Sequence, residues 1–243
     1  MIFLFTDFGT ADIYVGQVKA ALHKRAPKVP VIDLLHDAPA FNVKAGAHLL
    51  SALVARLPRG SVTLAVVDPG VGGRREPLAV LADGRWFVGP DNGLISVMAA
   101  RAAKRQVFTI GWRPRSISAS FHGRDLFAPV AAMLARGSRD SAKLRKKAAL
   151  AVDLGAGDLA EIIYVDHYGN AMTGLRAAGL PHGACLVVNN RRVGRARVFS
   201  EVPQGGIFWY ENSLGLAEIA ANAASAAATL GLQAGQAVAL EPG

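Results

Sequence analysis

The stretch SFHGRDLFAP, residues 120–129, holds the densest group of chemically able side chains in this sequence. His122, Arg124 and Asp125 fall within four residues, which places an imidazole, a guanidinium and a carboxylate close together. Such groups can move a proton or hold a charged ligand near neutral pH. The same residues also suit one charged turn at the start of a helix, so the stretch alone supports either interpretation.

Further polar side chains follow predicted strands, in turns rich in Gly and Pro. They are Asp7 after IFLF (2–5), Asp68 and Arg75 after VTLAVV (62–67), and Asp91 and Asn92 in GPDNG after WFV. Asp and Asn are ordinary turn formers in such places. Ligands of α/β sheets, however, collect beyond the carboxyl ends of the strands. Four such turns at one sheet edge, with His122 among them, predict a cleft.

Apolar runs typical of strands alternate with helical patterns in the first half of the chain. Strands are expected at 2–5, 29–34, 62–67, 78–82 and 107–110, and helices at 13–25 and 44–57. The second helix has apolar side chains along one face. This alternation predicts an α/β N-terminal domain over residues 1–145, with a mainly parallel sheet flanked by helices.

The second half changes to short strand-like segments separated by turn residues. Strands are expected at 162–165, 184–188, 196–200, 207–211 and 236–240, and one short helix runs from Ser225 as N-cap to Gly231. We predict a smaller, antiparallel, β-barrel-like C-terminal domain over 158–243, after a linker at 146–157.

Composition limits the class of protein. The chain has 243 residues, 51% of them hydrophobic, which suffices for a sizeable core. A single cysteine, Cys185, excludes an intrachain disulfide framework and a cysteine-based zinc site, and suits the cytoplasm. The apolar run at 2–5 is a strand and not a signal peptide, and no apolar stretch approaches the roughly 20 residues of a membrane span.

The net charge of +9 is concentrated in one block, because residues 101–147 carry twelve Lys or Arg against two acids. Such a block could contact nucleic acid, or it could be a solvated, Arg-rich surface. Neither interleaved aromatic residues nor an RNA-binding motif accompanies it, which favours the solvated surface.

Several other chemistries fit poorly. The chain has no GxGxxG after the first strand, no GxxxxGK[ST] loop, no GxSxG elbow and no metalloprotease spacing. Asp7, Asp12, Asp68 and Asp91 could in principle hold a magnesium ion, but turn roles and contacts to ligand hydroxyls explain them equally well. We therefore expect no metal and no cofactor.

Six motifs in order, along nearly the whole chain, carry a resemblance to a known family. They are TDFGTADIYVGQVK, VVDPGVGG, FVGPDNG, SFHGRDLFAP, VDHYGN and NSLGLAEIAAN. The sequence resembles the S-adenosylmethionine hydroxide adenosyltransferases, hydrolytic relatives of fluorinase and chlorinase. The resemblance implies hydrolysis of S-adenosylmethionine (SAM) to adenosine and methionine. It also implies a homotrimer, with each site between the N-terminal domain of one subunit and the C-terminal domain of a neighbour.

The resemblance also implies the catalytic residues. Asp68, Arg75 and His122 match a triad that handles water, and Phe121 matches a residue lining the pocket. Arg124 and Asp125 then fix the turn and the start of the following helix. The halogenating relatives replace the triad positions and carry an insertion. Neither change is present here, so the resemblance favours water as the nucleophile.

Substrate contacts carry over by position in the same way. Asp7 matches an acceptor for the ribose hydroxyls, and Phe41 an aromatic ring near the ribose. The remaining contacts are Asp12, Asp166 and Ser213 for the methionine amino group, and Asn170, Ala221 to Ala223, Phe199 and Tyr168 around adenine. At Leu214 the halogenating relatives have an Arg that meets the methionine carboxylate, so this contact is unassigned here. Phe41 and Phe199 could instead be core residues.

Three alternatives stay open, and their products or ligands distinguish them. An enzyme using halide would form 5′-chloroadenosine, and a nucleoside hydrolase would release adenine. A nucleoside-binding or nucleic-acid-binding module would bind RNA in a salt-dependent way through residues 101–147, without turnover.

Overall fold

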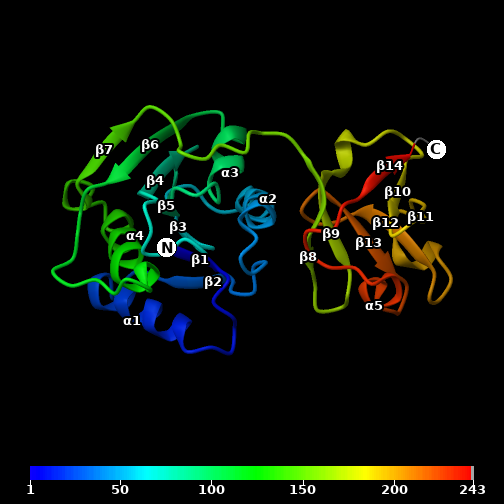
Figure 1. Ribbon diagram of the computed structural model, residues 1–243, viewed down its shortest axis with the longest axis horizontal. Coiled ribbons are helices and arrows are strands. Elements are labelled where there is room, and N and C mark those ends of the chain that lie inside the picture. Colours follow the sequence, from blue (N-terminus) through cyan, green and yellow to red (C-terminus); the bar gives the residue numbers. More distant parts are fainter. Residues whose placement is uncertain (242–243) are drawn as a thin grey trace. The chain divides into compact units, whose positions relative to one another are not determined.

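The computed structural model describes residues 1–241, which divide into two compact units (Figure 1). The first runs from Met1 to Ala156 and the second begins at Gly157. Residues 146–156, expected to be a linker, belong to the first unit, where the backbone N–H groups of Ala151 and Leu154 donate hydrogen bonds to its side chains. In residues 1–241, every helix falls short of the length and apolar character needed to cross a membrane.

A seven-stranded sheet forms the centre of the first unit, in the order β2-β1-β3-β5-β4-β6-β7. Its strands are β1 (Ile2–Thr6), β2 (Val31–Leu35), β3 (Val62–Val66), β4 (Pro77–Ala82), β5 (Arg85–Pro90), β6 (Arg105–Ile110) and β7 (Leu144–Lys147). The pairs β1–β2, β1–β3 and β3–β5 are parallel, whereas β4–β5, β4–β6 and β6–β7 are antiparallel.

The prediction of a mainly parallel sheet is therefore wrong, because the sheet is mixed. The cause is a tight hairpin between β4 and β5. Asp83 and Gly84, which join the two strands, both have positive φ, 46° and 80°. An Asp-Gly pair in this conformation reverses the chain within two residues and makes the flanking strands antiparallel.

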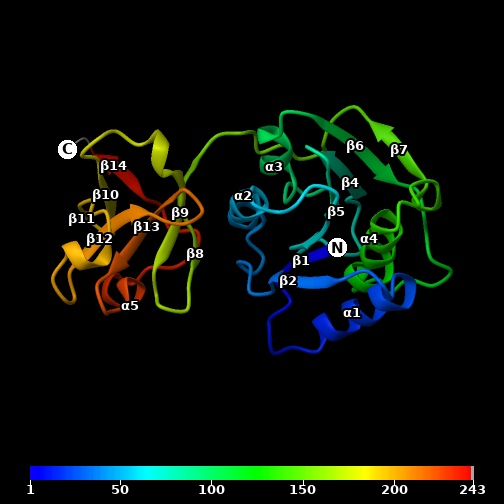
Figure 2. The same cartoon turned by 180° about the vertical axis from the view of Figure 1, so that it is seen from behind.

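Helices cover both faces of this sheet. They are α1 (Tyr14–Arg25), α2 (Val43–Val54), α3 (Ser96–Arg101) and α4 (Ala128–Ala135), the last preceded by a π-helical turn at Gly123–Phe127. Helix α1 packs against α4, and α2 against α3. The two pairs lie on opposite faces (Figures 1 and 2). Right-handed crossovers require this, since β1-α1-β2 and β2-α2-β3 run in opposite directions across the sheet.

The centre of the sheet is apolar throughout, since every residue of β1 and β3 is buried. The strand order reverses here. From β1 the chain continues to β2 on one side, and from β3 it continues to β4 and β5 on the other side. A crevice forms outside the carboxyl ends of strands at such a point. Asp7 follows the last residue of β1, and Asp68 lies two residues beyond β3.

The basic block maps largely to one margin of the sheet. Strand β7 is an edge strand that the sequence did not predict, and its Arg145 and Lys146 are exposed. Charged side chains on an edge strand discourage pairing with another chain. Lys147 differs, because its ammonium group contacts Asp91 and Glu76 at 2.6 Å each.

The second unit contains two antiparallel sheets, of four and three strands. The first has the order β12 (Ile207–Glu211), β13 (Leu216–Ala221), β9 (Ala171–Arg176), β8 (Leu159–Val165), and the second β11 (Arg191–Val193), β10 (Cys185–Val188), β14 (Ala239–Glu241). Trp209 is fully buried between them and donates its indole N–H to the Ala184 carbonyl at 2.9 Å. The small helix α5 (Ala226–Leu230) has the expected Ser225 N-cap. A closed barrel is not confirmed, since the described strands form two separate sheets.

The strand predictions in this unit differ from the structure in several places. The predicted strand at 196–200 is wrong, because Phe199–Glu201 forms a 3₁₀ turn and Glu201 accepts the backbone N–H of Arg197 at 2.8 Å. Strands β9 and β13 were not predicted. Their sequences, AMTGLR and LAEIAA, are rich in residues with low strand propensity, and their position inside the sheet overrides that propensity.

Candidate active site

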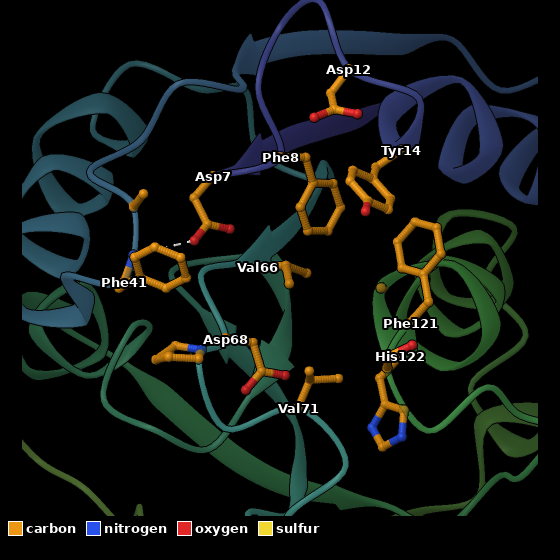
Figure 3. Close-up of a pocket in the computed structure, with 14 residues that line it drawn as sticks. Asp7, Phe8, Asp12, Tyr14, Phe41, Val66, Asp68, Val71, Phe121 and His122 are labelled. Carbon is orange, nitrogen blue, oxygen red and sulfur yellow. Dashed lines mark hydrogen bonds between the residues drawn. The ribbon is translucent and has the colours of Figure 1, made fainter.

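A cavity of about 370 Å³ opens beyond the carboxyl ends of β1 and β3 (Figure 3). It brings together six of the residues expected to form the site, from four separate loops: Asp7, Asp12, Phe41, Asp68, Phe121 and His122. Arg75 does not line the cavity and instead lies behind Asp68. The structure thus collects the N-terminal part of the predicted site in one place.

Asp68, Arg75 and His122 form a continuous chain of hydrogen bonds. The Arg75 Nε–H is shared between both Asp68 oxygens, at 3.1 and 3.0 Å, and Nη2 donates to Oδ2 at 2.5 Å. Nη2 also lies 2.9 Å from Nδ1 of His122. The Asp68 and Arg75 side chains are only 4% and 10% exposed, so this ion pair is shielded from solvent.

The contact with Arg75 fixes the tautomer of His122. A guanidinium can only donate, so Nδ1 of His122 must accept, and the neutral ring then carries its proton on Nε2. Burial lowers the pKa of His122, and the positive charge of Arg75 lowers it further. The imidazole is therefore neutral at pH 7, with Nε2–H as a donor.

A glycine lets the two triad loops approach each other. Gly72, in VDPGVGG, has a φ of +78°, and a Cβ there would lie 2.5 Å from the Ala119 carbonyl oxygen, just before SFHG. Only glycine permits both the left-handed backbone and this close contact. The Arg75 guanidinium then lies 5.4 Å from the centre of the buried Phe127 ring, which helps to hold it in place.

Asp7 and Phe41 lie side by side in the cavity, on the side opposite His122 (Figure 3). The Phe41 N–H donates to Asp7 Oδ2 at 3.5 Å, and Phe41 is 79% exposed. This exposure excludes the alternative that Phe41 is a core residue. Its φ of 61° is rare for a bulky residue, and such strain concentrates at functional sites. Burial raises the pKa of Asp7, and the charge of Asp68 adds to the effect.

An aromatic wall of Phe8, Tyr14 and Phe121 completes the cavity (Figure 3). The ring centres lie 5.4–6.2 Å apart in edge-on or tilted contacts. Phe8 and Tyr14 were not among the predicted site residues. Phe8 lies on the β1–α1 loop that carries Asp7 and Asp12, and Tyr14 directly follows that loop as the first residue of α1, which was a signal that could have found both.

Arg124 and Asp125 have the supporting role expected for them. Asp125 accepts the Ser118 N–H at 2.8 Å and pairs with Arg124, which fixes the turn before α4. Arg124 also donates to Gln17 on α1 at 2.7 Å and lies over the Phe121 ring, 5.0 Å from its centre. In SFHGRDLFAP, His122 and Phe121 thus line the cavity while the other two charges hold the loop.

The GPDNG turn does not join this cavity, so the expectation for Asp91 and Asn92 is wrong. Asp91 is 2% exposed and binds Lys147 and the N–H of Ala151, while Asn92 donates to the Val67 carbonyl at 2.9 Å. Of the four aspartates considered for magnesium, Asp91 thus lies apart from Asp7, Asp12 and Asp68. Throughout the described part of the chain, no three His, Cys, Asp or Glu residues gather in a way that could hold a metal ion.

The second unit has its own cavity, of about 620 Å³. Six predicted residues line it: Asp166, Tyr168, Asn170, Phe199, Ala221 and Ala223. Tyr210 and Ala224 also line it and were not predicted. Ser213 does not line it but lies exposed in the turn between β12 and β13, next to Leu214.

Asp166 organises the floor of this second cavity. Its Oδ1 accepts the N–H groups of Tyr168 and Asn170, at 2.9 and 2.8 Å, and its Oδ2 accepts the Asn170 side chain at 3.0 Å. The loop is tight, because a Cβ on Gly169 would fall 2.0 Å from the Ser225 hydroxyl. Ala223, on the other side, has a φ of 53°, a strained conformation like that of Phe41.

Both units match domains of one protein family. Residues 2–144 match the SAM hydroxide adenosyltransferase N-terminal domain, and residues 160–239 match the C-terminal domain of the same family. The chain belongs to the SAM hydroxide adenosyltransferase family. The predicted resemblance is thereby confirmed.

Curated members of this family match over nearly the whole chain. The (R)-S-adenosyl-L-methionine hydrolase of Thermus thermophilus is 40% identical, with 98% of each chain covered. The enzyme of the same name from Salinispora arenicola is 37% identical, covering 95% of this chain and 93% of that one. A fluorinase from Actinopolyspora mzabensis is more distant, at 25% identity over 98% and 96%.

Solved structures agree with the fold of this family member. A conserved protein from Thermotoga maritima superposes with a TM-score of 0.89 at 28% identity, covering 99% of this chain and all of the other. A conserved protein from Thermus thermophilus gives a TM-score of 0.77 at 38% identity, covering 99% of each chain.

Proposed function

We propose that this protein hydrolyses S-adenosyl-L-methionine to adenosine and L-methionine, and that it acts on the (R)-sulfonium epimer for which its hydrolase relatives are named. The observation that carries the proposal is the Asp68–Arg75–His122 chain, because Asp68 and His122 line a cavity that also holds the carboxylate of Asp7. A product assay tests it. Adenosine and methionine are expected in equal amounts, also in excess chloride, whereas 5′-chloroadenosine or adenine would overturn it.

The three triad residues divide the handling of water between them. Arg75 donates to Nδ1 of His122 and twice to Oδ2 of Asp68, whereas Oδ1 of Asp68 receives only the longer, shared bond from Nε. The groups left for water are therefore Asp68 Oδ1 as acceptor and His122 Nε2–H as donor. A water held between them has one proton directed at a carboxylate and its oxygen held by the imidazole. We thus assign the acceptor role to Asp68 and the donor role to His122.

The reaction then balances without a metal or an added cofactor. The water oxygen forms a bond to C5′ of the ribose, the C5′–S bond breaks with its electron pair going to sulfur, and the water proton passes to Asp68 and then to solvent. Sulfur leaves as a neutral thioether, so no acid is required on that side. The aromatic wall of Phe8, Tyr14 and Phe121 gives little solvation to charge, which favours the transition state because the sulfonium charge is being lost there.

The two cavities suit different parts of the substrate. In the first, Asp7 would accept hydrogen bonds from the ribose diol beside Phe41, and Asp12 would meet the methionine ammonium. In the second, Asn170 and the flat faces of Phe199 and Tyr168 would hold adenine, with Asp166 and Ser213 toward the amino group. Neither set of residues is complete alone.

We infer a homotrimer in which the first unit of one subunit and the second unit of a neighbour form each site. Mixing equal amounts of the inactive variants Asp68→Ala and Asn170→Ala into shared trimers is then expected to restore roughly a quarter of wild-type activity. The reason is that about one site in four combines an unmutated first unit with an unmutated second unit. Mixing Asp68→Ala with His122→Ala is the control, since both changes lie in the first unit and restore nothing. No recovery in the first mixture would contradict a site shared between subunits.

Replacing Asp7 by Ala should weaken adenosine binding by about 1–3 kcal/mol, through loss of a charged acceptor for the ribose hydroxyls. Wild type should bind 2′-deoxyadenosine more weakly than adenosine, and for the variant this difference should be small.

Because the pKa of Asp7 is raised, wild-type adenosine affinity should fall on acidification at a higher pH than an ordinary aspartate would give. Asp7→Asn should remove this pH dependence. Calorimetry measures each value, and equal losses for 2′-deoxyadenosine in wild type and Asp7→Ala would exclude this role.

A further inference from the structure

Beneath the second cavity lies a buried acid that the proposed mechanism does not use. Glu218, on β13, is 2% exposed, although glutamate is rarely buried so completely without a strong partner. Its two partners are neutral groups. Oε1 accepts from the Tyr210 hydroxyl at 2.5 Å, and Oε2 accepts from Nδ2 of Asn212 at 2.7 Å. Burial raises the pKa of Glu218, and the nearby charge of Asp166 raises it further.

The first of these contacts holds an aromatic wall of the cavity. Tyr210 is the direct cross-strand partner of Glu218 in the β12–β13 pair, so their side chains leave the same face of the sheet. The Tyr210 ring lines the cavity and packs against Phe199, with ring centres 5.3 Å apart. The bond to Glu218 ties the end of this ring to the sheet.

The second contact holds the β12–β13 turn. Oδ1 of Asn212 accepts the backbone N–H groups of Leu214 and Leu216, at 2.9 and 3.0 Å. With its oxygen committed to these two bonds, the amide of Asn212 must present its NH₂ group to Glu218. This turn also carries Ser213, so one buried carboxylate fixes both a wall of the cavity and the turn beside it.

We propose that Glu218 is a positioning residue for substrate binding, which holds the Tyr210 ring and the 212–216 turn in the conformation that receives the adenosyl and methionine groups. This inference rests on the proposed function for the identity of the ligand. It assigns Glu218 to affinity and not to the chemical step, which belongs to groups in the other unit.

Three variants test the donor and acceptor pattern. Glu218→Ala removes both bonds. Asn212→Asp keeps the acceptor for Leu214 and Leu216 but sets one carboxylate against another. Each is expected to raise KM for SAM and the dissociation constant for adenosine by about tenfold, the equivalent of one lost hydrogen bond to a charged group, with kcat within about threefold. The double variant Asn212→Asp/Glu218→Gln exchanges the amide and the carboxylate, so the side-chain NH₂ at position 218 can donate to the carboxylate at position 212. It should recover most of the lost affinity.

Thr173→Val is the matched control. Thr173 lies on the neighbouring strand β9 and donates a buried hydrogen bond to the Ala217 carbonyl at 2.7 Å, but it does not line the cavity. It should lower the melting temperature as the Glu218 variants do, while KM and adenosine affinity stay at the wild-type values.

Two outcomes would overturn the proposal. One is an unchanged adenosine dissociation constant in both Glu218→Ala and Asn212→Asp, and the other is an affinity in the double variant no better than in Asn212→Asp. If Glu218→Ala does not fold, the latter comparison still decides. Adenosine binding is measured without turnover, so a wild-type protein that binds adenosine but leaves SAM intact would refute the proposed hydrolysis and leave the test of Glu218 valid.

Discussion

Replacing Asp68 by Ala is expected to lower kcat by about 10²–10⁴-fold while adenosine affinity changes little, since a positioned proton acceptor acts in the transition state. His122→Ala should have an effect of the same order. The double variant should be little worse than the more damaged single variant, because Arg75 joins the two residues into one hydrogen-bonded unit. Rapid-quench measurement of adenosine formation, with calorimetry for adenosine binding, separates these effects.

Two controls sharpen this test. Ser120→Ala changes a residue that lines the same cavity and takes no part in the Asp68–Arg75–His122 chain, so kcat should stay within about twofold. His122→Gln can still accept from Arg75 and donate to water, so it should retain more activity than His122→Ala. Losses that multiply in the double variant, or lost adenosine binding with turnover spared, would show that these residues only shape the cavity.

The second large effect is expected on stability, from Lys147→Met. Asp91 has a side chain only 1% exposed, and Lys147 is the cation that faces it, at 2.6 Å. Burial lowers the pKa of Lys147, but its hydrogen bonds to Asp91 and Glu76 outweigh this and raise it, so the ammonium is charged at neutral pH. Removing it leaves a buried carboxylate unpaired, which should cost about 3 kcal/mol in free energy of unfolding.

Arg145→Met is the matched control for that experiment. Arg145 lies on the same edge strand but is exposed, so its loss should change the free energy of unfolding by less than about 0.5 kcal/mol. Urea unfolding measures both variants. Equal stabilities for Lys147→Met and Arg145→Met would show that Asp91 does not depend on the ion pair and is held by the Ala151 N–H alone.

The sequence could predict that the N-terminal residues of the candidate site lie together, because strand ends determine where they are. Asp7 and Asp68 follow apolar runs that read clearly as β1 and β3, and parallel strands end at the same edge. Asp91 has the same signal after β5 and does not line the cavity. What diverts it is Lys147, 56 residues further along the chain, a long-range contact that no local pattern contains.

The mistaken predictions of the fold also have physical causes. The sheet became mixed through two residues, Asp83 and Gly84, whose hairpin turn was not recognised. Strand β7 was not predicted because its sequence, LRKK, has the charge of a solvated surface, and an edge strand tolerates that charge. Strand β13 was missed because Ala-rich segments carry little strand preference of their own.

The roles proposed for the site residues likewise depended on more than local sequence patterns. The catalytic roles proposed for Arg75 and His122 rest on the family resemblance, and the tautomer of His122 follows from its distance to Arg75. Glu218 had no sequence signal at all, since nothing in LAEIAA indicates that its glutamate is buried. Only the cross-strand pairing with Tyr210 and the turn at Asn212 place it under the cavity.

The most direct test of the account is turnover of (R)-S-adenosyl-L-methionine in ¹⁸O-labelled water with saturating chloride. Attack of water on C5′ predicts adenosine carrying one ¹⁸O atom at its 5′ hydroxyl, formed in equal amount with unlabelled methionine. Adenine, 5′-chloroadenosine, or adenosine without the label would contradict the mechanism assigned to Asp68, Arg75 and His122.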